Sequence, residues 1–329
     1  MTGGILITGG AGYIGSCFAW ACRDAGIPFA ILDDLSTGDR RAPPASAPFV
    51  VAKASDRAAV MRLVHQHGLD TIVHFAASTS VEESVRDPGK HERNNVEETR
   101  GLIETTMELG LRNFVLCSTA AVYGDGHEDC VSEETPAVPL NPYGQSKLDA
   151  EALLAEAQAI GGPRFVALRA FNVAGADPRL RTGRRAGGEG NLIGVCCDVA
   201  LDRSKAVVIH GADYPTPDGT CIRDYVHVAD LVEAHISAVA HLARGGESMV
   251  LNCGNGQGHS VRQVIAAFDE VLGRKLATTP GPARPGDPIQ VVADTSLITA
   301  TLGWTPRRAD LRTMVRSALE WRQSHVVAV

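Results

Sequence analysis

The chain has 329 residues, of which 44% are hydrophobic and 21% charged, and its formal net charge is −7. Such a chain supplies enough apolar side chains for one large or two modest domains. Its negative charge argues against a surface for nucleic acid or for anionic membranes. No apolar run approaches the roughly 20 residues of a membrane span, and no signal peptide precedes the first predicted strand.

The eight cysteines contain no Cys-x-x-Cys pair, and the eleven histidines show no metal-ligand spacing. Several of the cysteines lie inside apolar runs, so we interpret them as reduced core residues. We therefore expect a cytoplasmic protein that has no metal site.

A glycine loop, TGGAGYIG over residues 8–15, follows the first predicted strand, residues 4–7, and opens a segment with helical spacing of apolar residues. Gly9 permits the tight turn, Gly12 lets the backbone approach a pyrophosphate, and Gly15 lets helix and strand pack closely. The pyrophosphate would lie at the positive N-terminal end of the helix. A purely structural glycine turn is the alternative, but the strand–turn–helix context favours a dinucleotide site.

The second predicted strand, residues 28–32, ends at Asp33 and Asp34. These carboxylates come about 20 residues after the glycine loop, where an acidic side chain binds the adenosine ribose. A carboxylate there repels a 2′-phosphate, and no arginine follows before Arg40. The sequence therefore predicts NAD rather than NADP.

Predicted strands and helices alternate through the first half of the chain, which favours an α/β fold with a doubly wound parallel sheet of the Rossmann type. From residue 172 on, glycine-rich loops separate shorter elements. We predict a mainly NAD-binding domain over residues 1–171 and a smaller, mainly substrate-binding region over residues 172–329, with chain crossovers between the lobes. The predicted strands are residues 4–7, 28–32, 48–52, 71–75, 113–117 and 164–168, and the predicted helices are residues 14–25, 56–67, 96–109 and 142–159.

Tyr143 and Lys147 are four residues apart and share one face of the predicted helix over residues 142–159. A carbinol carbon loses a hydride only if its hydroxyl proton also leaves, so the site needs a base beside the nicotinamide. Free tyrosine has a pKa of about 10, and both Lys147 and the cationic nicotinamide would lower the pKa of Tyr143. The spacing alone also fits an ordinary tyrosine and lysine, but beside the glycine loop it predicts a catalytic base.

Several segments resemble the extended short-chain dehydrogenase/reductase superfamily, and the block DYPTPDGTCIRDYVHV over residues 213–228 closely resembles the UDP-glucose 4-epimerase family. This resemblance implies an isomerase of galactose metabolism that epimerises carbon 4 of a UDP-hexose through a transient 4-keto intermediate. An epimerase of UDP-N-acetylhexosamine or of another UDP-sugar is the alternative. The superfamily resemblance is carried by residues 8–15, 74–77, 94–96, 143–147 and 169–172, and residues 284–287 fit the later arginine loop of the epimerases.

The resemblance also implies roles for individual residues. Tyr143 is the implied acid/base, Lys147 is its partner and a ligand of the nicotinamide ribose, and Thr119 contacts the reacting sugar oxygen. The implied cofactor-binding residues are Gly9, Gly12, Tyr13, Ile14, Gly15, Asp33, Asp34, Phe75, Ala76, Ala77, Asn94, Lys147 and Phe171. The implied substrate-binding residues are Thr119, Tyr143, Asn172, Asn191, Leu192, Val208, His210, Arg223, Arg284, Asp287 and Val291.

Four of these residues are expected to select the substrate. Arg223 and Arg284 match the family's arginines that bind the nucleotide-sugar diphosphate bidentately, and Asp287 would accept from the uridine ribose. Val291 falls where a bulky tyrosine excludes acetamido sugars in some members. Its smaller side chain implies room for an N-acetyl group at carbon 2, or else a core strand residue that points away from the sugar.

Ala120 and Ala121 follow Thr119, where 4,6-dehydratases of the superfamily carry an acid pair. Neither alanine can donate or accept a proton, so the resemblance favours an epimerase over a dehydratase. A net dehydrogenase or reductase acting on a nucleotide sugar, or a non-enzymatic NAD sensor, remains as an alternative. Retention of Tyr143 and Lys147 counts against a sensor, which needs no base.

Most family members carry an aspartate that contacts adenine where this chain has Lys53, which cannot accept a hydrogen bond. Adenine would then be held by backbone or apolar contacts.

The segments over residues 96–109 and 142–159 resemble the helices of a four-helix dimer interface in the superfamily. This resemblance implies a homodimer.

Overall fold

A seven-stranded parallel sheet forms the centre of the larger lobe, in the strand order β10-β6-β5-β4-β1-β2-β3. The structure is a computed structural model that describes residues 3–125, 130–185, 191–284 and 287–325. The strands are β1 (Gly4–Thr8), β2 (Phe29–Asp33), β3 (Phe49–Val51), β4 (Leu69–His74), β5 (Asn113–Thr119), β6 (Arg164–Ala170) and β10 (Met249–Cys253).

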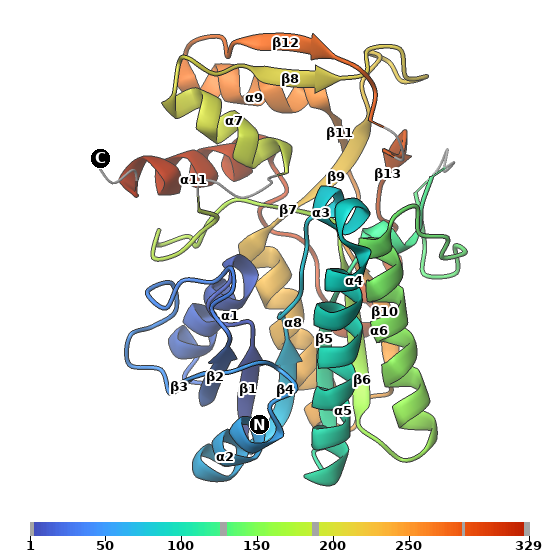
Figure 1. The fold of residues 1–329 in the computed structure, drawn as a ribbon. Helices are drawn as coiled ribbons and strands as arrows, with labels where there is room; N and C mark the ends of the chain where they lie inside the picture. Colours follow the sequence, from blue (N-terminus) through green and yellow to red (C-terminus); the bar gives the residue numbers. More distant parts are fainter. Residues whose placement is uncertain (1–2, 126–129, 186–190, 285–286, 326–329) are drawn as a thin grey trace.

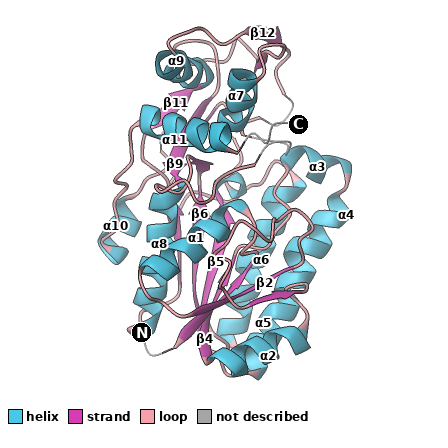
Figure 2. Ribbon diagram, turned by 90° about the vertical axis from the view of Figure 1, so that its left-hand side faces the viewer, coloured by secondary structure: helices cyan, strands magenta, loops and turns pink. Residues whose placement is uncertain are grey.

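Helices cover both faces of this sheet (Figures 1 and 2). Alternate residues of a strand point to opposite faces, so Ile5 and Ile7 of β1 pack in one apolar cluster while Leu6 packs in the other. All five residues of β1 are buried, which explains why its first four form a continuous apolar run in the sequence. The first face carries α1 (Tyr13–Asp24), α8 (Val228–Ala243) and α10 (Ser296–Leu302), and the second carries α2 (Arg57–His67), α5 (Glu98–Glu108) and α6 (Pro142–Ala159).

The prediction of a doubly wound parallel sheet is confirmed. Helix α6 has the predicted bounds, because Asn141 caps its N-terminus by accepting from the Gly144 N–H at 2.9 Å and Pro142 follows at the first helical position. The helix predicted over residues 96–109 begins earlier. A short helix, α4 (Pro88–His91), runs into a π-helical turn over Glu92–Glu97, and α5 continues from it.

The smaller lobe lies above the carboxyl ends of the large sheet (Figure 1). It contains the sheet of β7 (Asn172–Ala174), β9 (Ile222–His227), β11 (Gly258–Ser260) and β13 (Gln290–Val291), and the pair β8 (Val207–His210) and β12 (Thr278–Gly281). One apolar cluster joins its helices α7 (Leu192–Leu201), α9 (Val261–Leu272) and α11 (Leu311–Ser324). The chain crosses between the lobes, since α8 and β10 pack in the large lobe although they follow β9. A further helix, α3 (Val81–Arg86), and a 3₁₀ turn, Ala120–Val122, complete the described elements.

Contacts from α1 hold the two lobes together. The Tyr13 hydroxyl donates to the Gly175 carbonyl oxygen at 2.6 Å. Arg181 reaches back from the same segment to form ion pairs with Asp24 at the end of α1, at 2.8 Å, and with Asp177, at 2.7 Å. The helix that starts at the glycine loop therefore also supports the smaller lobe.

Six of the eight cysteines are buried, as expected for core residues. Cys117 is only partly buried, and Cys130, which lies outside any apolar run, is exposed. Across the residues that the structure describes, no helix is long and apolar enough to cross a membrane.

Candidate active site

The glycine loop brings the start of α1 against the ends of β1 and β4. Gly9 has a φ of +75°, and a Cβ there would lie 2.4 Å from the Ala76 backbone nitrogen. A Cβ on Gly15 would lie 2.2 Å from the Gly9 carbonyl oxygen. Gly12 forms the N-cap of α1, and among the described residues no side chain caps this end by a hydrogen bond. The first N–H groups of α1 therefore suit a dinucleotide pyrophosphate.

Asp33 and Asp34 have different surroundings. The buried Asp33 carboxylate accepts from the Ala11 N–H and from the Leu35 N–H, both at 2.8 Å. Burial raises its pKa, and these backbone hydrogen bonds oppose that shift. Asp34 is exposed and accepts from the backbone and side chain of Ser36. The geometry thus favours Asp33 as the ribose ligand, since it lies directly beneath the glycine loop.

The π-helical turn ties the segment after β4 to α6. Asn95 accepts from the Ser78 N–H at 2.7 Å and donates to the Ser146 hydroxyl at 2.9 Å. Asn94 donates to the Ser78 hydroxyl at 2.9 Å. Ser78 follows Phe75, Ala76 and Ala77, so this network fixes the segment assigned to the cofactor. Asn95 and Ser146 were missed in the sequence analysis, although the NNV motif already contains Asn95.

Thr119, Tyr143 and Lys147 come together where β5 ends and α6 begins. The Thr119 side chain is close enough to the Tyr143 hydroxyl to lower its pKa, and Thr119 Oγ1 accepts from the Ala121 N–H at 3.2 Å. Lys147 is buried one helical turn after Tyr143. The buried His91 ring packs edge-on against the Tyr143 ring, with 6.0 Å between the ring centroids. The structure therefore brings together the three residues assigned to catalysis.

Burial acts on the protonation of both residues in the chain without its cofactor. It raises the pKa of Tyr143 to about 12, and the neighbouring Thr119 side chain only partly offsets that shift. Burial also lowers the pKa of Lys147. The expectation that Lys147 and the cationic nicotinamide together lower the pKa of Tyr143 concerns the cofactor-bound site and stays a prediction. A lower phenol pKa requires another positive charge close to the ring.

A buried ion pair lies directly behind these residues, and the sequence analysis missed it. Arg169 on β6 donates two hydrogen bonds to Glu151, at 2.7 and 3.1 Å, and the Ser118 hydroxyl donates to the same carboxylate. Glu151 is one turn after Lys147 on α6. Its helical spacing from Lys147 was the available signal, but Arg169 is far away in the chain. The pair thus fixes the strand residue that precedes Thr119.

Arg223, Asp287 and Val291 form a second group, in the smaller lobe. Arg223 on β9 is paired with Val291 on β13 across the sheet and forms an ion pair with Asp287. Val291 is buried, with 7% of its surface exposed, and packs in one apolar cluster with Val122 and Phe171. Val122 lies three residues after Thr119, so this cluster connects the two groups. Phe171 therefore contacts the substrate-side cluster as well as lying at the end of β6.

The remaining assigned residues have separate surroundings. Asn191 caps α7 by accepting from the Gly194 N–H and donates to the Val173 carbonyl oxygen at 2.6 Å. Asn172 on β7 is paired with Tyr225 on the neighbouring strand β9. Leu192, the first residue of α7, packs against the apolar cluster of the smaller lobe. Val208 and Arg284 are exposed, and His210 Nδ1 lies 3.1 Å from the Pro282 carbonyl oxygen.

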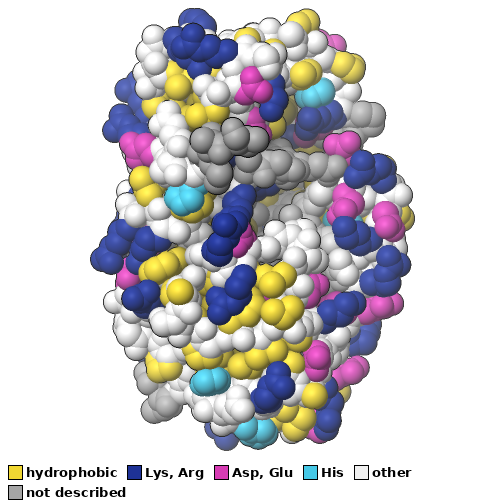
Figure 3. Space-filling view, turned by 60° about the vertical axis from the view of Figure 1, so that its left-hand side comes forward, with side chains coloured by type: hydrophobic (Ala, Val, Ile, Leu, Met, Phe, Trp, Pro, Cys, Tyr) yellow, Lys and Arg dark blue, Asp and Glu magenta, His cyan; other side chains and the backbone are white. Residues whose placement is uncertain are grey.

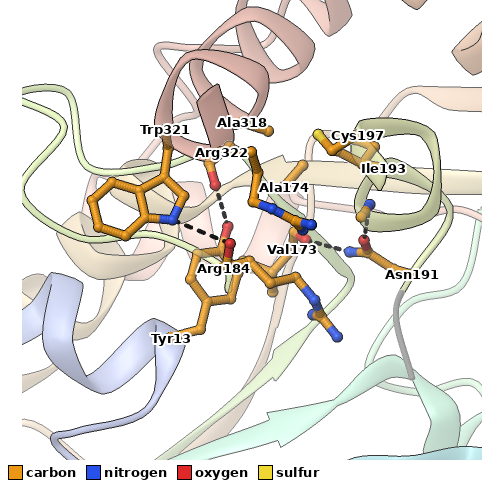
Figure 4. Close-up of a pocket in the computed structure, with 12 residues that line it drawn as sticks. Tyr13, Val173, Ala174, Arg184, Asn191, Ile193, Cys197, Ala318, Trp321 and Arg322 are labelled. Atoms are coloured by element: carbon orange, nitrogen blue, oxygen red, sulfur yellow. Dashed lines mark hydrogen bonds between the residues drawn. The ribbon is translucent and has the colours of Figure 1, made fainter. Parts of the chain in front are cut away.

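Tyr13 and Asn191 line a small cavity of about 10 Å³ together with Arg184 and Trp321 (Figure 4). It lies between the start of α1 and helices α7 and α11. In a space-filling view, Lys and Arg side chains are spread over this face of the molecule, several of them beside acidic side chains (Figure 3).

This fold and this arrangement of residues define a dinucleotide-dependent enzyme. The glycine loop and the carboxylate of Asp33 fit NAD, which supplies a hydride acceptor when it is bound. The chain belongs to the NAD dependent epimerase/dehydratase family, whose model matches residues 5–254, and NAD is its cofactor.

Three relatives illustrate the similarity. The chain is 47% identical over 320 residues to the UDP-glucose 4-epimerase of Azospirillum brasilense, covering 97% of this chain and 92% of that protein. The UDP-glucose 4-epimerase from Brucella ovis, solved in complex with NAD, is 37% identical with a TM-score of 0.93, covering 97% of this chain and 98% of that one. The UDP-Glc/GlcNAc 4-epimerase of Campylobacter jejuni is 39% identical with a TM-score of 0.84, covering 98% and 99%. The predictions of the family and of NAD are confirmed.

We predict that Glu151→Gln destabilises the protein, because Arg169 would keep a buried charge without its carboxylate. Breaking a buried pair in this way costs about 3 kcal/mol of the free energy of unfolding. Urea denaturation measures the loss, and Glu156→Gln, an exposed change on the same helix, is the matched control. Equal midpoints for the two variants would contradict the importance given to the Glu151 pair.

Proposed function

We propose that the protein epimerises carbon 4 of a UDP-hexose, interconverting UDP-glucose and UDP-galactose through a transient 4-keto sugar. The observation that carries this proposal is the group formed by Thr119, Tyr143 and Lys147, with Ala120 and Ala121 directly beside it. A base and a hydroxyl that can hold the sugar oxygen are available there, but neither alanine can drive elimination of water. The name of the Azospirillum relative supports the same reaction.

Each residue of the group has a distinct part in this proposal. Tyr143 Oη takes the proton of the 4-hydroxyl as hydride leaves carbon 4, and it returns the proton when the ketone is reduced from the opposite face. Thr119 holds the sugar oxygen beside the phenol. Lys147 favours the phenolate and binds the nicotinamide ribose. Since burial keeps the pKa of Tyr143 at about 12, the cationic form of NAD is needed to bring the phenol into its working range.

The substrate diphosphate is assigned to Arg223 and Arg284. A guanidinium carries five N–H donors in a planar fork that matches two phosphate oxygens. Arg223 is held by Asp287 and still has donors available for a phosphate. Asp287 in turn has acceptor capacity left for the uridine ribose. The apolar cluster around Val291 then lies between this anchor and Thr119, where the sugar would fit.

Turnover without added cofactor tests the reaction as a whole. An epimerase returns its hydride to the carbon that lost it, so NAD need not leave. We expect purified protein to release NAD(H) on denaturation and to convert UDP-galactose into UDP-glucose without added cofactor. Product analysis by anion-exchange chromatography measures this conversion. Dependence on added NAD, with NADH accumulating in step with product, would instead support a net dehydrogenase, and bound NAD without turnover would support a sensor.

Substitution of Tyr143 tests its assignment as the base. Tyr143→Phe removes the ionisable oxygen but keeps the ring against His91, so we expect folding and bound NAD(H) to be unchanged. The turnover number should fall roughly 10²–10⁴-fold, the usual effect of losing a general base. Lys147→Met should slow the reaction and move the rising limb of the pH profile to higher pH, because the pKa of the phenol rises when the phenolate loses its cation. Turnover by Tyr143→Phe within a few-fold of wild type would exclude Tyr143 as the base.

A second substrate class follows from Val291. We infer that UDP-N-acetylhexosamines are also turned over, more slowly than UDP-glucose and UDP-galactose. Valine leaves more room than the bulky tyrosine that excludes acetamido sugars, but it offers no hydrogen bond to the amide. The 39% identical Campylobacter relative is named for both sugars.

We predict that Val291→Tyr abolishes turnover of UDP-N-acetylglucosamine but retains turnover of UDP-galactose. Val291→Ala, which cannot overpack the cluster, should raise the ratio of the two rates in favour of the acetamido sugar. Initial rates on both substrates measure that ratio. An unchanged ratio in both variants would mean that Val291 points away from the sugar.

We infer that the protein is a homodimer formed by α5 and α6. These helices lie side by side on one face of the large sheet (Figure 1), as in the four-helix interfaces of the superfamily. This support is an analogy of fold. Light scattering at micromolar concentration is expected to give twice the mass of the chain, and a monomeric mass would refute the dimer.

A further inference from the structure

Lys53 and Glu98 form an ion pair beside the end of β3. Lys53 Nζ lies 3.3 Å from Glu98 Oε1, and the second carboxylate oxygen accepts from the Ser55 N–H at 3.0 Å. The Lys53 side chain is 65% exposed and the Glu98 side chain only 16%. Glu98 is the first residue of α5, directly after the π-helical turn. Its carboxylate is therefore held in place from two sides.

The position of this pair follows from the strand register. The assigned ribose ligand, Asp33, is level with Val51 on the neighbouring strand β3, and the Ala52 N–H donates to the Asp33 carbonyl oxygen at 3.2 Å. Lys53 is the next residue. A dinucleotide whose pyrophosphate lies at the start of α1, and whose ribose lies at Asp33, continues outward along the strand ends. Its base therefore reaches the end of β3, next to Lys53.

Small apolar side chains surround the same place. Ala52, Ala54 and Ala76 belong to one apolar cluster, and Ala54 is buried. Ala76 also lies against Gly9 of the glycine loop. A flat base can stack between such side chains, whereas its polar edge must find partners of its own. Among the described residues, Lys53 and Glu98 supply charged partners at this edge.

We propose that Glu98 and Lys53 together recognise the adenine base of the dinucleotide through hydrogen bonds. Glu98 accepts from the exocyclic amino group of adenine, and Lys53 donates to the adjacent ring nitrogen N1. The ammonium has three donors and the carboxylate about four acceptor sites, so each group can bind the base without breaking the ion pair. The carboxylate thus comes from α5 and not from the strand end. The inference rests on NAD binding and is independent of the substrate assigned above.

Hypoxanthine tests this arrangement because it reverses the pattern of adenine. It places a carbonyl oxygen where adenine has the amino group and an N–H where adenine has its N1 acceptor. The fixed ribose prevents the base from exchanging these two positions. The carbonyl would then face the carboxylate and the N–H would face the ammonium. One mismatched polar contact of this kind is worth about tenfold in binding.

The experiment measures which dinucleotide the protein retains. Purified protein is equilibrated with a large, equimolar excess of NAD and nicotinamide hypoxanthine dinucleotide until successive samples agree. After desalting and denaturation, the released dinucleotides are quantified by chromatography. We expect wild type to retain NAD over the hypoxanthine analogue by about 10 to 1. Equal retention by wild type would overturn the proposal.

Variants separate base recognition from a purely structural ion pair. Glu98→Ala should bring the retention ratio close to 1, and Lys53→Met, which keeps the aliphatic stem, should lower it in part. Glu97→Ala, an exposed change one residue earlier, is the control and should leave the ratio unchanged. A structural role alone would lower the melting temperature of Glu98→Ala without changing the ratio, and that result would also overturn the proposal. If Glu98→Ala fails to fold, the retention ratios of wild type and of Lys53→Met still test the proposal.

Discussion

The contact between the start of α1 and the ends of β1 and β4 is the constraint on which the rest of the molecule depends. It is possible only because Gly9 and Gly15 lack a Cβ, which would otherwise meet backbone atoms at 2.4 and 2.2 Å. This contact aims the N–H groups of α1 at the pyrophosphate position. It also directs Tyr13 to the Gly175 carbonyl. The glycine loop and the attachment of the smaller lobe therefore depend on neighbouring residues at the start of α1.

Helix α6 carries three buried or partly buried ionisable residues on one face. Tyr143, Lys147 and Glu151 are each four residues apart, and a pitch of 3.6 residues per turn places them on one face. Burial favours the neutral form of two of these residues. It raises the pKa of the Tyr143 phenol and lowers the pKa of the Lys147 ammonium. The buried Glu151 and Arg169 pair holds the end of β5 in place.

Strand register brings together the residues of the smaller lobe that we propose to anchor the substrate. The pairing of β13 with β9 brings Val291 beside Arg223, although they are far apart in the chain. The apolar cluster of Val291, Phe171 and Val122 then joins β13 to the segment after β5. Packing between the lobes therefore sets the distance between Arg223 and Thr119.

The sequence by itself determined the local features of the protein. The bounds of α6, the strand that leads into the glycine loop, and the spacing of Tyr143 and Lys147 all depend on neighbouring residues. Caps, turns and periodicity encode such features directly. The resemblance of residues 213–228 added the family, because a long block of matching residues is specific.

Tertiary structure decided whatever depends on residues that are distant in the chain. The choice of Asp33 over Asp34, the pairing of Arg169 with Glu151, and that of Lys53 with Glu98 follow from the order of the strands. The raised pKa of Tyr143 follows from burial, which no spacing reveals. The π-helical turn before α5 was missed because its sequence continues a helical pattern, and nothing local in the chain marks the wider turn that packs against α6.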